Sequence, residues 1–273
     1  MRSQNSPILK AKENLRTVLA ERHSISDHPK VSEAIESLIE VWKKEDSTIT
    51  SPPYQASAAP ARSELLLGEW RSLSASKYPD RIEKPGEPGI FQYTLGRLSF
   101  NIFQPKKLVC TVNEVFNVVS KIEDDQQKDD NVIASYNNVI ELTAHTDEGD
   151  LPAEICMDGR CSTKSDERLE VVFTAGELRK GAAVQSDKKL LALWEKTFEG
   201  AYAKAEKEKG FKESILQWLV KSMLNMTMPT DECAKYEMKR PMKGYVDVLY
   251  LDEDLRITRG NYGSIVIVER VTE

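Results

Sequence analysis

The hydrophobic pattern changes along the chain, from a helical period at the N-terminus to strand-like runs further on. In the first part of the chain, apolar positions recur every three or four residues, for example at Ile8, Leu15 and Leu19. The segment Ser24–Pro29 interrupts this pattern with capping residues and with a proline suited to the first turn of a helix. We therefore predict a helical hairpin over residues 1–45.

The next segment has no apolar period. Residues 46–62 are rich in Pro, Ser, Thr and Ala, which is typical of a linker. From residue 63 onward, short runs of β-branched and aromatic residues alternate with Gly, Pro and acidic turns. Strands are predicted near residues 65–75, 89–95, 97–104, 107–120, 131–144, 152–158, 160–165 and 167–175. So many short strands favour an antiparallel barrel or sandwich, and a large sheet tends to close because closure removes its exposed edges.

A helical pattern interrupts the strands at residues 186–228. Asp187 stands at the start as a capping residue, and Leu190, Trp194 and Phe198 form an apolar stripe. We predict a helical cover packed on the sheet. A lid over the mouth of a barrel, or a surface that contacts a lipid monolayer, is the functional alternative.

Three short strands joined by polar turns end the chain, over residues 244–270. The turns contain Asp252 and Asp254 in the first case, and Gly260 and Gly263 in the second. Turns this short force neighbouring strands to pair antiparallel. Glycine supplies the positive φ that such a turn needs.

The same C-terminal stretch carries a family resemblance. The run Tyr250-Leu251-Asp252-x-Asp254-Leu255-Arg256-Ile257-x-Arg259-Gly260-Asn261-x-Gly263 resembles the signature of the plastid lipid-associated proteins, also called plastid fibrillins. Two earlier segments agree with it in the right order, Leu65-Leu66-x-Gly68-x-Trp70 and Thr94-Leu95-Gly96-Arg97-Leu98-Ser99-Phe100. The resemblance implies a mainly β fold with helical additions, in which residues 63–273 form an antiparallel lipocalin-like β-barrel.

Function is also implied by this resemblance. It suggests a plastid protein of the plastoglobule, thylakoid or stroma that binds or carries prenylquinones, carotenoids, fatty acids or galactolipids without a cofactor. Two alternatives remain open: a structural coat of plastid lipid droplets, and an enzyme that modifies a lipid inside the barrel. The sequence contains no Gly-x-Ser-x-Gly, phosphate-binding loop, dinucleotide fingerprint or His-Glu-x-x-His, and it shows no evident nucleophile–base pair.

A barrel of roughly eight to ten strands can enclose one small ligand. The aromatic side chains expected to face such an interior are Trp70, Phe91, Phe100, Phe103, Phe116, Tyr136, Phe173 and Tyr250. The alternative is that these side chains simply fill the core.

The family motif also predicts a structural contact. In lipocalins an arginine from a late strand packs across the tryptophan of the first strand. Here Trp70 follows Gly68, and Arg256 is the expected partner, with Arg259 and Arg270 behind it. A guanidinium over an indole contributes about 0.5–2 kcal/mol. We further expect the carboxylates of Asp252 and Asp254 to hold these arginines by bidentate hydrogen bonds.

Two cysteines suggest a redox pair. The run from Cys156 to Cys161 reads as a hairpin turning on Asp158-Gly159, which would place the two thiols opposite each other within disulfide range. The alternative is a pair of reduced thiols. Of the other cysteines, Cys110 reads as core and Cys233 as a loop residue. No metal site is expected, because the three histidines do not cluster with the cysteines.

Charge and hydropathy exclude further classes. The net charge of -6 and the pI of about 5.4 make nucleic acid a poor partner. No run of about eighteen apolar residues predicts a membrane span. The first residues lack the apolar core of a secretory signal and are too short before the first predicted helix for a transit peptide.

Overall fold

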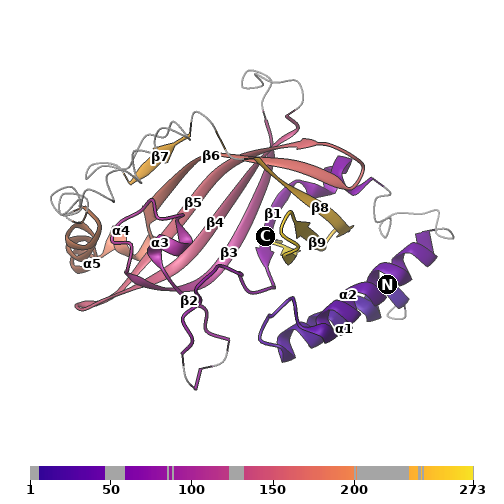
Figure 1. Cartoon of the computed structure of the whole chain (residues 1–273), viewed down its shortest axis with the longest axis horizontal. Coiled ribbons are helices and arrows are strands. Elements are labelled where there is room, and N and C mark those ends of the chain that lie inside the picture. The colour runs from indigo at the N-terminus through magenta and orange to yellow at the C-terminus, as the bar shows by residue number, and fades with distance from the viewer. Residues whose placement is uncertain are drawn as a thin grey trace.

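The computed structural model describes residues 6–46, 59–84, 86–87, 89–122, 132–199, 201, 234–238, 241 and 243–272. Figure 1 shows an antiparallel sheet with a helical hairpin against one part of it and short helices at its far end. In chain order, the strands are β1 (Gly68–Ser72), β2 (Gln92–Thr94), β3 (Val109–Lys121), β4 (Ala134–Thr146), β5 (Gly149–Thr163), β6 (Arg168–Lys180), β7 (Lys235–Glu237), β8 (Lys243–Leu251), β9 (Leu255–Gly260) and β10 (Ile265–Arg270).

Eight of the described strands form a ring. The hydrogen-bonded order β1-β10-β9-β8-β6-β5-β4-β3 returns to its start because β1 also pairs with β3. Each of these pairs is antiparallel, as the short turns predict. Mainly antiparallel β structure with added helices is therefore confirmed.

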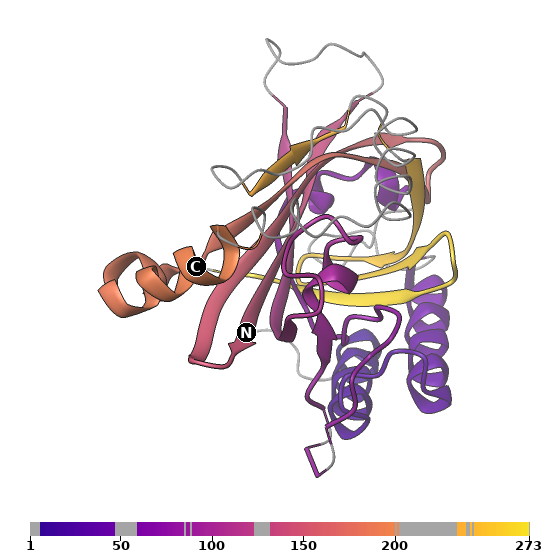
Figure 2. The same cartoon turned by 60° about the vertical axis from the view of Figure 1, so that its left-hand side comes forward.

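The ring uses only one half of its longest strands. β1 pairs with residues 116–119 of β3, and β8 pairs with residues 168–172 of β6. The other halves of β3, β4, β5 and β6 continue beyond the ring as an open sheet, which β2 and β7 extend. The strands fan apart in this direction in Figure 2.

Buried apolar side chains in the described ranges form three clusters. The ring cluster lies among the ring strands and includes Trp70, Val119, Tyr136, Val171 and Val248. The open-sheet cluster covers the projecting half of the sheet, and the hairpin cluster joins the N-terminal helices to the last strands. The ring therefore has an apolar cluster of its own, which the partly buried Phe173 connects to the open-sheet cluster.

Short helices cover the open half of the sheet. They are α3 (Leu95–Leu98), α4 (Ala182–Ser186), α5 (Lys188–Trp194) and the π-helical turn η4 (Glu195–Glu199). Asp187 caps α5 as predicted, because its carboxylate accepts from the backbone N–H groups of Lys189 and Leu190. Trp194 and Phe198 pack into the open-sheet cluster. The remainder of the predicted helical insertion, from residue 202, and residues 47–58 of the predicted linker lie outside the described residues.

The N-terminal helices form the predicted hairpin. α1 (Pro7–Glu21) and α2 (Pro29–Asp46) lie side by side beneath β8 and β9 in Figure 1. Leu15 and Leu38 are fully buried in the hairpin cluster, which also contains Ile257 of β9. The Trp42 ring meets the Tyr250 ring edge-on, with centroids 5.7 Å apart. Since β9 alternates its side chains, Leu255 and Ile257 face the helices while Arg256 faces the ring interior.

Two strand predictions were wrong. Residues 97–104 fold as the end of α3 and a turn, where Phe100 and Asn101 adopt positive φ values of 52° and 61° that a strand does not accommodate. Residues 152–158 and 160–165 belong to one strand, β5, whose pairing with β6 shifts by one residue between Asp158 and Gly159. A Cβ at Gly159 would lie 2.6 Å from the Tyr136 carbonyl oxygen, so this glycine permits a close backbone approach and does not form a turn.

Within the described ranges, no helix has the length and apolar character needed to cross a membrane.

Docking of the hairpin predicts a large loss of stability on Leu38→Ala. Leu38 is fully buried between α1 and the last strands, so its truncation should lower the free energy of unfolding by about 2–5 kcal/mol. Glu36→Ala, on the exposed side of the same helix, is the matched control and should change it by less than about 0.5 kcal/mol. Urea unfolding measures both; an equal effect of the two variants would contradict the docking.

Candidate functional site

The candidate site centres on Trp70, which β1 places inside the ring. The residue is fully buried, and its indole Nε1 donates to the Leu66 carbonyl at 2.9 Å. The Cζ atoms of two arginines lie over its ring, Arg256 at 4.8 Å and Arg270 at 4.2 Å from the centroid. The predicted contact between Trp70 and Arg256 is confirmed. Arg270 is a second partner, whereas Arg259 is exposed.

Arg270 ties the beginning of the ring to its end. Its Nη1 and Nη2 donate to the carbonyls of Leu67 and Leu65, each at 2.6 Å, and its Nε donates to the Glu253 carbonyl at 2.5 Å. The guanidinium lies so close to Gly68 that a Cβ there would be 2.4 Å from Nη1, and Gly68 has a φ of +123°. Only glycine fits this position without strain, which explains Gly68 in the family motif.

Arg256 is bonded much less completely. It is 2% exposed, and its Nη2 donates to Asn117 Oδ1 at 2.5 Å. Its Nε and Nη1 are buried without a hydrogen-bond partner among the described residues. Burial lowers the pKa of Arg256. Asn117 is itself held in place, since its Nδ2 donates to Asn138 Oδ1 at 3.0 Å.

The structure brings some of the predicted interior residues together. Trp70 and Tyr136 belong to the ring cluster, and the partly buried Phe173 contacts both this cluster and the open-sheet cluster. Phe103 and Phe91 belong to the open half of the sheet.

Three of the predicted interior residues lie elsewhere. Phe100 is 58% exposed in the turn after α3. Tyr250 is buried against the N-terminal hairpin, because β8 turns that side chain outward from the ring. Phe116 directly precedes Asn117 in β3, so its side chain points to the opposite face from the one that contacts Arg256.

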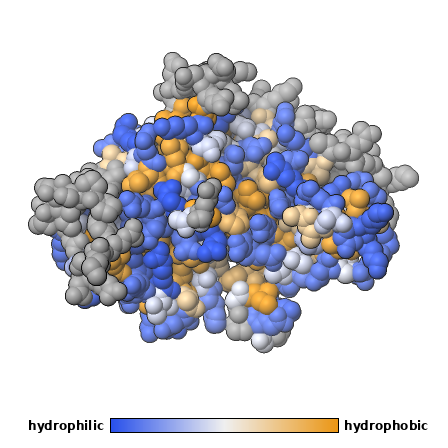
Figure 3. Space-filling view, turned by 180° about the vertical axis from the view of Figure 1, so that it is seen from behind, coloured by the Kyte–Doolittle hydropathy of each residue, from blue (hydrophilic) through white to orange (hydrophobic). Residues whose placement is uncertain are grey.

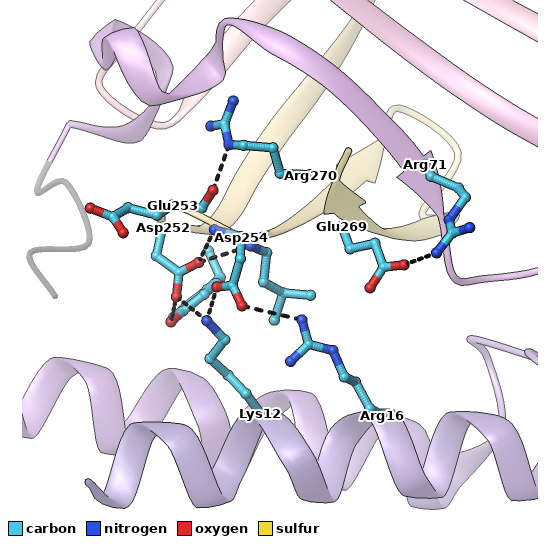
Figure 4. A network of polar contacts seen from close by, with 10 residues as sticks. Lys12, Arg16, Arg71, Asp252, Glu253, Asp254, Glu269 and Arg270 are labelled. Atoms are coloured by element: carbon cyan, nitrogen blue, oxygen red, sulfur yellow. Dashed lines mark hydrogen bonds and ion pairs between the residues drawn. The ribbon is translucent and has the colours of Figure 1, made fainter. Parts of the chain in front are cut away.

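Asp252 and Asp254 bind the N-terminal hairpin. Lys12 Nζ donates to Asp252 Oδ2 at 2.7 Å and also bonds Asp254, while Arg16 Nη2 donates to Asp254 Oδ2 at 3.3 Å. Figure 4 shows both cations reaching from α1 to the β8–β9 turn. The prediction that these carboxylates hold Arg256, Arg259 or Arg270 was therefore wrong.

The two carboxylates of this network differ in their further contacts and in their pKa values. Asp252 Oδ1 accepts from the backbone N–H groups of Asp254 and Leu255, which shapes the turn, and its Oδ2 accepts from the Tyr250 hydroxyl at 2.5 Å. Burial raises the pKa of Asp252 against the opposing effect of Lys12. Burial also disfavours the charge on Asp254, but the hydrogen bonds with Asp252 and Lys12 outweigh it and lower the pKa of Asp254 to about 2.

The glycines of the second turn fit the motif as predicted. Gly263 has a φ of +79°, and its N–H donates to the Gly260 carbonyl at 2.9 Å. The Gly260 N–H in turn donates to the Ser264 carbonyl at 2.9 Å. These bonds close the β9–β10 turn and leave the Tyr262 side chain 94% exposed.

The disulfide hypothesis was wrong. Cys156 and Cys161 lie on the single strand β5, where five residues span about 16 Å, and both thiols are free. Burial raises the pKa of each thiol to about 11 and that of Cys110 to about 12, so these thiols are protonated and poorly reactive. Cys233 lies outside the described residues. In the described part of the chain, no group of three or more His, Cys, Asp or Glu side chains is placed to hold a metal ion.

One row of polar side chains on the outer face of the sheet was not predicted from the sequence. His145 Nε2 lies 2.7 Å from Thr111 Oγ1, and its Nδ1 lies 2.7 Å from Asp150 Oδ1. These distances resemble those of a nucleophile, base and acid. However, Gln92 Nε2 also donates to the Thr111 hydroxyl at 2.9 Å, so the row reads as cross-strand bonding that joins β2 to β5. Strand register, which brings these residues together, is not readable from their spacing in the sequence.

The contacts of Arg270 predict that its substitution lowers the stability of the protein more than substitution of Arg71. Arg270→Met removes three hydrogen bonds to backbone carbonyls and should lower the free energy of unfolding by about 2–4 kcal/mol. Arg71→Met, which breaks an exposed ion pair with Glu269, should cost less than about 1 kcal/mol. Denaturant unfolding followed by tryptophan fluorescence compares the two, and similar losses would contradict this account of Arg270.

The lowered pKa of Asp254 predicts an acid-dependent stability. Its folded pKa of about 2 lies below the ordinary 3.8, so its ion pairs stabilise the fold above about pH 4 and are lost as pH falls toward 2. Asp254→Asn should therefore destabilise the protein at neutral pH, by on the order of 1 kcal/mol because the side chain is half exposed. The difference from wild type should shrink as pH falls through this window, as measured by urea unfolding. Glu253→Gln in the same turn is the control, and a pH-independent difference for Asp254→Asn would contradict the assignment.

Comparison with known proteins agrees with the motif. The model of the PAP_fibrillin family matches residues 90–269, which covers β2 to β10 and leaves the N-terminal hairpin and β1 outside. No curated protein and no solved structure matches the chain. With Asp252, Arg256 and Gly263 all inside a match that spans most of the chain, the protein belongs to the plastid lipid-associated protein (fibrillin) family.

Proposed function

We propose that this protein binds a hydrophobic small molecule of the plastid, without altering it chemically, inside the ring of strands acting as a lipocalin-like barrel. The ligand would be a prenylquinone, carotenoid, fatty acid or galactolipid. One observation carries this proposal: the ring encloses an apolar cluster of its own, distinct from the cores under the two helical layers. Family membership agrees with it.

Desolvation would drive the binding. Burial of apolar surface contributes about 25 cal/mol per Å², so ~300 Å² of ligand surface supplies several kcal/mol before the cost of ordering. The side chains that would contact the ligand are aliphatic or aromatic, such as Val119, Val171 and Val248, with Phe173 between the ring and the open half of the sheet.

Contact with a lipid monolayer is a second candidate function. Apolar side chains reach the surface on several elements, including Tyr262 at 94% and Val266 at 40% exposure near the β9–β10 turn. Figure 3 shows apolar side chains gathered near the upper middle of the face opposite to the view of Figure 1. A carrier that collects its ligand from a lipid surface would use both the apolar ring interior and the exposed apolar side chains.

Lipid retention tests the proposal. Organic extraction and mass spectrometry of the purified protein should recover one class of hydrophobic molecule in an amount comparable to the protein. Val119→Phe places extra volume inside the ring and should reduce this recovery, whereas Val118→Phe, on the opposite face of β3, should not. Circular dichroism checks that both variants fold. Recovery at the level of a mock purification would count against the proposal, as would equal recovery from the two variants.

A further inference from the structure

The two arginines at Trp70 differ in how their donors are used. All three nitrogens of the Arg270 guanidinium donate to backbone carbonyls, so this residue is fully occupied in closing the ring. Arg256 has one hydrogen bond, to Asn117, and two nitrogens without partners among the residues described. Arg256 therefore has two donor nitrogens that no described residue uses.

The charge of Arg256 is also uncompensated. The described groups around it are the indole of Trp70, the amide of Asn117, the phenol of Tyr136, the thiol of Cys161 and a second cation, Arg270, which further lowers the pKa of Arg256. Burial raises the pKa of both Tyr136 and Cys161, so neither supplies a negative charge at neutral pH. A buried cation without a counter-charge, and with unpaired N–H groups, is costly unless something else satisfies it.

We propose that Arg256 binds the carboxylate of a fatty acid whose acyl chain occupies the apolar interior of the ring. This rests on the proposed function and names the ligand class within it. A carboxylate supplies one negative charge and two acceptor oxygens, which suit the forked donors of a guanidinium. The guanidinium has two edges that can bind a carboxylate, one formed by Nε and Nη2 and the other by Nη1 and Nη2. Asn117 accepts only one of the two Nη2 hydrogens, so one edge can still offer two donors to a carboxylate.

The other ligand classes satisfy Arg256 less well. Carotenoids, prenylquinones and galactolipids are uncharged, so their binding would leave the buried cation without a counter-charge. A carboxylate is small enough to enter an apolar interior together with its chain. Val119, Val171, Leu169 and Val248 of the same cluster provide the apolar surface that an acyl chain requires.

The test compares cis-parinaric acid with its methyl ester, using the increase in fluorescence of the polyene on binding to the delipidated protein. The two probes share a chain and differ in charge. Wild type should bind the acid about tenfold or more tightly than the ester, because only the acid forms a charge-assisted pair. Arg256→Met should remove this preference and keep the affinity for the ester.

Two further variants make the result specific. Arg259→Met changes an exposed arginine of the same strand and should keep the preference for the acid. Asn117→Asp is nearly isosteric and places a carboxylate where the amide oxygen now accepts from Arg256. Because this carboxylate compensates the charge of Arg256, the variant should bind cis-parinaric acid about tenfold more weakly and its methyl ester with unchanged affinity. This variant keeps the test decisive if Arg256→Met does not fold.

The outcomes separate the two proposals. Equal binding of acid and ester by wild type overturns the role of Arg256 and leaves hydrophobic binding supported. A preference for the acid that survives both Arg256→Met and Asn117→Asp also overturns it. Binding of neither probe overturns this inference together with the proposed function.

Discussion

The ring of strands depends on the burial of Trp70 at the point where β1 closes it. β1 is short, yet it pairs with β3 on one side and β10 on the other, so it joins the two ends of the strand order. The indole fills the interior at this junction, and Arg270 covers it while bonding carbonyls of Leu65 and Leu67 just before the strand. Cation–π attraction and hydrogen bonding thus act on the same residues, in a place where water is excluded.

A second arginine at the same tryptophan has a different environment. Arg256 enters from β9, whose alternate residues face the hairpin, so the strand carries an apolar contact on one side and a charge on the other. The apolar side is satisfied by α1 and α2. The charged side is satisfied only in part, because Arg256 donates to Asn117 while its Nε and Nη1 have no partner among the described residues.

The β8–β9 turn links these two environments. Asp252 shapes the turn through backbone N–H groups, receives Lys12 from α1 and accepts from the Tyr250 hydroxyl. Arg270 bonds the carbonyl of Glu253 in the same turn. The family motif is therefore a junction where the hairpin, the last strands and the start of the ring meet, and its charged residues act mainly in holding these parts together.

The sequence by itself determined the local elements, because local elements follow from periodicity and turn chemistry. The helical hairpin, the strands β3 and β4 and the C-terminal meander follow from apolar spacing, capping residues and glycines. The motif indicated the family and the contact between Trp70 and Arg256. Tertiary structure alone decided which charges meet. Lys12 binds Asp252, which lies 240 residues further along the sequence, and the position of a lysine in a helical stripe does not indicate its partner. It also decided that the chain continues as one strand through Asp158-Gly159, since a glycine suits a tight turn and a close strand approach equally well. Tertiary structure likewise decided that Arg270 is fully bonded while Arg256 has donors without a partner among the described residues, because strand pairing sets which carbonyls and amides come into range.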